Sequence, residues 1–89
     1  MNDREKLTIL EVIPYTDDMS FREFCSEYPD TPAKGEKSEW SALFSQLREL
    51  KKEGLLRIEE EEVSGKQYKQ IAGLRLTQAG RDWVKEKML

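Results

Sequence analysis

Few side chains in this 89-residue chain could carry out covalent chemistry. The chain has no histidine and one cysteine, Cys25, so a Cys/His zinc site cannot be assembled within one copy. Ser–His–Asp and Cys–His nucleophiles are excluded for the same reason. The five glycines are scattered and match no phosphate-binding loop motif. We therefore expect a protein that is not an enzyme and that holds no metal and no cofactor.

The remaining candidates are polar and basic side chains that could bind nucleic acid. They lie on the outer face of a predicted third helix and on the hairpin after it. This candidate set is Ser38, Ser41, Ser45, Gln46, Arg48, Lys52, Lys66 and Lys69, with Tyr68 among the polar neighbours. Arginine can make paired hydrogen bonds to guanine, and glutamine to adenine, in the major groove. Serine and lysine suit phosphate oxygens, which position a protein without reading sequence.

The charge distribution permits nucleic-acid binding but does not by itself indicate it. The net charge is −3. Residues 1–35 carry four basic and eight acidic side chains, whereas residues 36–89 carry eleven and ten. The half that would touch DNA is thus close to neutral, and a strongly basic footprint is missing.

Two short helices are expected in the first part of the chain, over residues 3–13 and 20–28. Each is followed by a proline, which disfavours helical geometry at the residue before it. Asp3 is expected to cap the first helix and Ser20 the second, the latter as part of a Ser-x-x-Glu capping box. Residues 15–19 between them are expected to form a loop.

The third helix is predicted over residues 38–53. Its apolar stripe includes Trp40, Phe44 and Leu47 at helical spacing, which indicates a core-facing side. The open alternative is that the two aromatic residues are exposed and form a docking patch. Gly54 is placed to end this helix in a left-handed conformation.

A charged hairpin follows the third helix. A tight turn is expected at Gly65, where glycine tolerates positive φ. That turn would place Ile58 opposite Ile71. By the same register, Glu60 would face Lys69.

Two segments resemble winged-helix regulators of bacteria and archaea. Residues 47–56, LRELKKEGLL, resemble the end of a recognition helix and the first wing strand. Residues 74–80, LRLTQAG, resemble the Leu-Thr-x-x-Gly signature that follows the wing in the MarR and PadR type families. The resemblance covers roughly residues 40–82. It implies an α+β fold, a single winged-helix domain over 1–89 in the order helix-helix-helix-strand-wing-strand-helix.

The resemblance also implies a function, which is binding of double-stranded DNA. The third helix (about 38–53) would enter the major groove, and the hairpin wing (about 59–72) would contact the backbone. Arg48 and Gln46 would lie nearest the bases, and the lysines of the candidate set would hold phosphates. We expect a cytoplasmic transcriptional regulator, acting as a homodimer.

An alternative is a winged-helix protein–protein interaction module that does not bind DNA. The acidic balance, the aromatic residues of the third helix and the four glutamates at 59–62 favour it. The outer face of the third helix would then be ordinary solvated surface. Lys66 and Lys69 would pair with the glutamates across the hairpin, which contributes little stability.

Overall fold

The computed structural model describes residues 1–67 and 69–89, so the expected place of Tyr68 lies outside the described residues. Four helices and three strands follow one another in a mixed order. They are α1 (Asp3–Leu10), β1 (Met19–Ser20), α2 (Phe21–Glu27), α3 (Lys37–Lys52), β2 (Leu56–Glu62), β3 (Lys69–Leu76) and α4 (Gln78–Met88). The fold class is α+β, as predicted, with an antiparallel sheet.

The first helix begins at Asp3 as expected, but its cap is a different residue and it ends earlier than expected. Its cap is Asn2, whose side-chain oxygen accepts from the backbone N–H of Glu5 at 2.8 Å. The helix ends at Leu10 because the next residues form tighter turns, with the N–H of Ile13 donating to the carbonyl of Leu10 at 3.2 Å. The predicted Ser20 cap of α2 is confirmed, since its Oγ accepts from the N–H of Glu23 at 3.1 Å.

The third helix ends as the sequence predicts. Gly54 has φ +80°, and its N–H donates to the carbonyl of Lys51 at 3.0 Å. The N–H of Leu55 then donates to the carbonyl of Leu50 at 3.1 Å. A left-handed glycine at this position closes the last carbonyls of the helix and turns the chain into β2.

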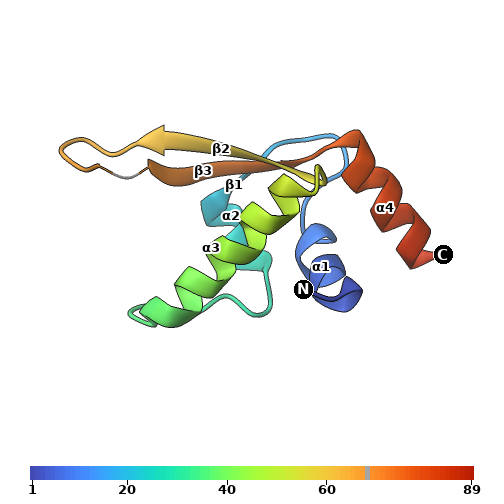
Figure 1. Cartoon of the computed structure of the whole chain (residues 1–89), viewed down its shortest axis with the longest axis horizontal. Helices are drawn as coiled ribbons and strands as arrows, with labels where there is room; N and C mark the ends of the chain where they lie inside the picture. Colours follow the sequence, from blue (N-terminus) through green and yellow to red (C-terminus); the bar gives the residue numbers. More distant parts are fainter. Residues whose placement is uncertain (68) are drawn as a thin grey trace.

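The central strand of the sheet is β3, with β1 on one side and β2 on the other (Figure 1). The expectation of a loop over residues 15–19 is wrong at its end, because Met19 pairs with Leu74 and Ser20 with Gly73. A two-residue strand is too short to show alternation, so the sequence pattern could not reveal it.

The predicted register of the hairpin is also wrong. Ile58 pairs with Leu74 and not with Ile71, and Glu60 pairs with Ile71 and not with Lys69. Two features cause the shift. The loop between the strands is longer than two residues, and the pairing is interrupted by a bulge between Glu59 and Glu60.

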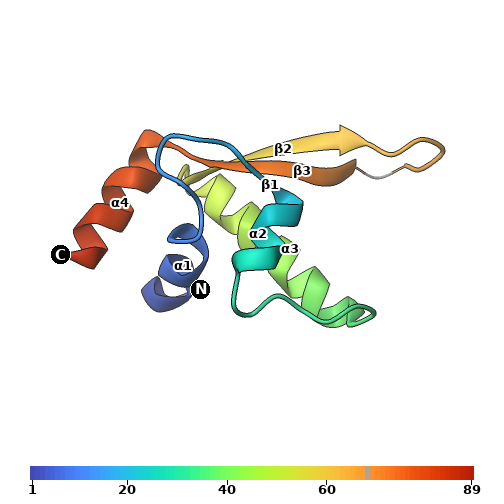
Figure 2. The same ribbon diagram turned by 180° about the vertical axis from the view of Figure 1, so that it is seen from behind.

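The core lies between one face of the sheet and the helices. Figure 1 shows α2 and α3 beneath the β2–β3 hairpin, and Figure 2 shows α1 and α4 together at the end away from the hairpin loop. The buried residues form one cluster of Ile9, Leu10, Ile13, Met19, Phe24, Tyr28, Leu43, Leu47, Leu50, Leu55, Leu56, Ile71, Leu74, Leu76 and Val84. The hairpin projects beyond this core and sets the 45 Å long axis of the 45 × 22 × 22 Å molecule. Within the described residues, every helix is too short or too polar to cross a membrane.

The start of α4 is fixed against the end of α3. Thr77 Oγ1 accepts from the N–H of Gly80 at 2.9 Å and donates to the carbonyl of Gly54. A Cβ on Gly80 would lie 2.0 Å from the carbonyl oxygen of Leu55. The threonine and the glycine of the Leu-Thr-x-x-Gly segment are therefore a helix cap and a close backbone contact.

Candidate nucleic-acid interface

The outer face of α3 is exposed as the helical spacing predicts. The exposed members of the candidate set on this helix are Ser38, Ser41, Ser45, Arg48 and Lys52. Gln46 is different, because it is half-buried. Arg48 lies two positions further along the chain, which is about 200° around the helix axis. The structure therefore does not bring Gln46 together with Arg48, and the base-reading role expected for Gln46 has no geometric support.

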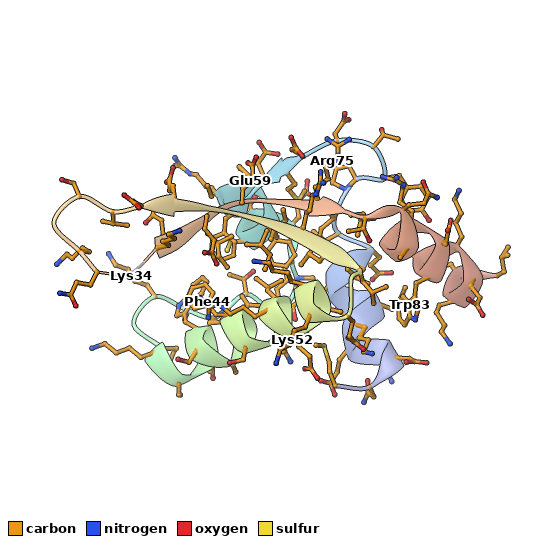
Figure 3. The ribbon with its side chains drawn as sticks, turned by 45° about the horizontal axis from the view of Figure 1, so that its top comes forward. Lys34, Phe44, Lys52, Glu59, Arg75 and Trp83 are labelled. Atoms are coloured by element: carbon orange, nitrogen blue, oxygen red, sulfur yellow. The ribbon has the colours of Figure 1, made fainter. Side chains whose placement is uncertain are left out.

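A cleft of about 770 Å³ lies between the N-terminus of α2, the side of α3 and the hairpin. We call it the hairpin cleft. Its lining is Ser20, Phe21, Arg22, Phe44, Arg48, Glu61, Lys69, Gln70, Ile71 and Ala72. In Figure 3, Phe44 rises from α3 toward the hairpin. The cleft has an apolar floor and a rim that carries three cations, one from each of three elements.

The cations of the candidate set form no ion pair with the described residues. The ion pairs there join Lys6 to Glu53, Arg75 to Asp18 and Lys87 to Asp3. Gln70 Nε2 donates to Glu61 Oε1 at 2.7 Å, so this hairpin carboxylate is held by an amide. One alternative was that the hairpin lysines form ion pairs with the neighbouring glutamates. In the described part of the chain they form no such pairs.

Arg22 is a candidate residue that the sequence analysis missed. It is exposed in the first turn of α2 and lines the hairpin cleft with Arg48 and Lys69. Its helix begins directly after the Ser20 cap, which is readable from the sequence. The sequence does not reveal that this turn lies beside the hairpin, because β1 fixes that position through a strand too short to predict.

Aromatic packing holds α2 against α3 below the cleft. The ring of Phe21 lies 5.8 Å from that of Phe44 and 6.4 Å from that of Trp40, between centroids. Trp40 Nε1 donates to the carbonyl of Ala33 at 3.0 Å. The leucines of the predicted core stripe, Leu43, Leu47 and Leu50, are buried, whereas Trp40 and Phe44 are half-buried and pack against the core. The stripe is therefore confirmed at its leucines and only in part at its aromatic residues.

The basic end of α3 has acidic neighbours. A shallow groove beside the hairpin cleft is lined by Ser45, Arg48, Glu49, Lys51, Lys52 and Glu60. Figure 3 places Lys52 at the end of α3 nearest β2. An approaching phosphate would therefore meet both signs of charge, and cations dominate only at the cleft rim and at the hairpin loop.

Two other features of the sequence carry no site. Cys25 is half-buried, and burial raises the pKa of its thiol, which favours the thiol over the more nucleophilic thiolate. Within the described residues, no three side chains of the His, Cys, Asp or Glu type are grouped so that they could hold a metal ion.

No protein-family model matches the chain, and neither a curated protein nor a solved structure gives a significant match. The function is therefore inferred from the geometry of the candidate interface. That geometry offers an exposed helix face, a projecting hairpin beside it and three cations around the cleft between them.

Proposed function

We propose that this protein is a winged-helix DNA-binding protein that acts as a transcriptional regulator. The element order supports the proposal, because a helix pair and an exposed third helix are followed by a projecting antiparallel hairpin. The observation that carries it is the convergence of Arg22, Arg48 and Lys69, from α2, α3 and β3, on one cleft next to the exposed face of α3. Cations from separate elements on one surface suit the phosphates of a duplex.

In this proposal α3 enters the major groove, which is about 12 Å wide and admits a helix. Serines 38, 41 and 45 on the exposed face are small, so they let the helix backbone approach the bases. Arg48 is the residue placed to read a base, since its guanidinium can bond two acceptors of guanine. Lys52, Lys66 and Lys69 would hold phosphates, together with Arg22.

A single domain of this size makes few contacts, so specific binding would need two copies on a two-fold site. We therefore propose a homodimer on DNA. Half-sites one helical turn apart, or a multiple of it, would place the two α3 helices in successive major grooves on one face of the duplex.

The test is a salt titration of binding to mixed duplex DNA. The wild type is compared with the triple variant Arg48→Ala, Lys52→Ala, Lys66→Ala. The slope of log K against log salt concentration is negative, and each lost phosphate contact reduces its magnitude by about 0.9. We expect the wild type to bind steeply less well as salt rises, and the triple variant to lose most of that dependence.

A matched control removes three cations elsewhere, through Arg4→Ala, Lys85→Ala and Lys87→Ala on α1 and α4. It should bind as the wild type does. An equal loss of DNA affinity in both triple variants would mean that only the net charge of the protein matters, and it would refute the proposed DNA-binding face of α3 and the hairpin. No binding by folded wild type at low salt would refute DNA binding by this domain.

The second candidate is a protein-interaction module, and one observation favours it. The floor of the hairpin cleft is apolar, formed by Phe21, Phe44, Ile71 and Ala72. A partner docked there would be held by burial of apolar surface, which salt does not weaken. This candidate predicts that a protein partner stays bound at high salt. It also predicts that Phe44→Ser abolishes binding of that partner, whereas the triple variant Arg48→Ala, Lys52→Ala, Lys66→Ala retains it.

A further inference from the structure

A second cationic surface lies on the face of the sheet that the helices leave open. Arg57 and Arg75 are direct cross-strand partners. The next pair, Leu56 and Leu76, is buried in the core, so the two arginines project from the opposite face. Like charges directly opposite each other on a sheet are normally destabilising. The pairing therefore needs a compensating negative charge.

A third arginine joins this pair. A hollow of about 290 Å³ is lined by Arg57, Arg75, Leu76, Thr77, Gln78 and Arg81. We call it the arginine hollow. It lies where β3 ends and α4 begins, and Figure 3 shows Arg75 on the side of the sheet away from Phe44 and Lys52 of α3. None of its residues belongs to the candidate set for DNA.

Two of the three guanidinium groups are already oriented by the protein. Arg75 donates to Asp18 Oδ1 at 3.3 Å and to the carbonyl of Thr16 at 3.2 Å. Arg81 donates to the carbonyl of Tyr15 at 3.0 Å, and its other terminal nitrogen to Gln78 Oε1 at 2.9 Å. Carbonyl and amide acceptors fix the direction of a guanidinium without cancelling its charge.

The positive charge of the hollow is only partly compensated. Two carboxylates are bonded to its lining within the described residues: Asp18, which accepts from Arg75 and is 61% exposed, and Asp82, which accepts from Gln78 Nε2 at 3.0 Å. Arg57 has no hydrogen-bond or ion-pair partner in the described part of the chain. Glu59, the next acid on the outer face, lies over Gly73, with Oε2 3.2 Å from where a Cβ of that glycine would be. The lining thus has three guanidinium groups and two bonded carboxylates, of which only Asp18 forms an ion pair with one of the arginines.

We propose that the arginine hollow binds the phosphate group of a small molecule. Arginine is suited to this because its planar guanidinium offers paired donors to two phosphate oxygens. Arg75 and Arg81 are pre-oriented by the contacts above, and Arg57 supplies a guanidinium free to close on the ligand. The bound dianion would relieve the repulsion between Arg57 and Arg75. This site is separate from the proposed DNA surface, since the sheet lies between them.

The test is a titration of the ¹⁵N-labelled protein with inorganic phosphate, followed by NMR at the backbone amides of residues 75–81 and the arginine Nε–H groups. Sodium chloride at equal ionic strength is the salt control. We expect saturable shifts confined to the hollow with phosphate and none with chloride. Arg57→Gln should weaken binding about tenfold or more, as expected for a lost charge-assisted hydrogen bond. Arg4→Gln, which removes an exposed arginine from α1, should bind as the wild type does.

Further outcomes decide between the alternatives. Chemical-shift changes that grow linearly with salt concentration and do not saturate would overturn the proposal. Equal affinity of Arg57→Gln and the wild type for phosphate would also overturn it. Adenosine monophosphate in place of phosphate distinguishes the source, since tighter binding would assign an organic phosphate and equal binding a free one. If duplex DNA moves the same resonances and Arg57→Gln weakens DNA binding, the arginines belong to a DNA surface and the small-molecule site is refuted.

Discussion

Gly80 lies in the first turn of α4, directly against the backbone of Leu55. A Cβ there would come within 2.0 Å of the Leu55 carbonyl oxygen, and that carbonyl also accepts from the N–H of Thr77 at 3.3 Å. Backbone held from both sides cannot yield as a flexible side chain would. We predict that Gly80→Ala lowers the free energy of unfolding by about 1–3 kcal/mol, although alanine favours helix. Urea denaturation followed by circular dichroism measures this.

The control for this prediction is Ala79→Gly, one position earlier on the exposed side of the same turn. It should cost about 1 kcal/mol or less, which is the ordinary effect of glycine in a helix. A Gly80→Ala variant as stable as the wild type would show that α4 does not begin against Leu55.

At the scale of the elements, what the sequence predicts well is set by local chemistry. The body of α3 follows from its apolar spacing, its end from Gly54, and the start of α4 from Thr77. These features depend on residues within a turn or two of one another. The hairpin register depends instead on a bulge near Glu59 and on a loop whose length no turn motif reveals.

The candidate interface likewise has one part that the sequence predicts and one part that it does not. The exposed face of α3 is predictable because a helix repeats every 3.6 residues. The position of Arg22 is not, because it depends on how α2 is packed under the hairpin by β1 and the rings of Phe21 and Phe44. The arginine hollow joins residues from β2, β3 and α4, so only the observed register brings Arg57 opposite Arg75.

The hairpin loop should be separable from the rest of the fold. None of the described residues 63–67 belongs to the buried core. We predict that replacing residues 63–68 by Asn-Gly, a favoured two-residue hairpin turn, changes the free energy of unfolding by less than about 1 kcal/mol. The magnitude of the slope of log K for DNA binding against log salt concentration should decrease by about 0.9, because Lys66 is lost.

Full-length Lys66→Gln is the control for the shortened hairpin. It removes the same charge without changing the loop, so it should reproduce the change in salt slope. A large loss of stability on shortening would show that the loop supports the core. Unchanged DNA binding in both variants would remove the hairpin tip from the proposed interface.

At the scale of the whole molecule, two cationic surfaces lie on opposite sides of one sheet in a protein of net charge −3. A duplex bound to α3 would therefore leave the arginine hollow open to solvent. If both proposals hold, the protein could bind DNA and a small phosphate compound at once.

The stability of the whole molecule should fall in alkaline solution. A hydrogen bond to Glu53, 2.6 Å long, raises the pKa of Lys6 above its ordinary 10.5. Burial raises the pKa of Cys25 above 9.0 and that of Tyr28 above 10.0. Each group therefore keeps its proton to higher pH when folded than when unfolded. Unfolding then releases protons above about pH 9, and the free energy of unfolding decreases as pH rises through the folded-state values.

Cys25→Ala isolates the first step of this decrease. In urea unfolding between pH 7 and pH 11, the wild type should be equally stable up to about pH 8.5 and should begin to lose stability as the pH passes 9. The variant has a constant offset from its smaller side chain, but its decline should begin only near pH 10, where Tyr28 and Lys6 of the unfolded chain begin to lose their protons while burial and the bond to Glu53 raise their pKa in the folded protein. The onset of the decline is the quantity to compare, since the offset does not vary with pH. The same onset in both proteins would show that the thiol has the same pKa in the folded and unfolded chain, which the partial burial of Cys25 on α2 should prevent.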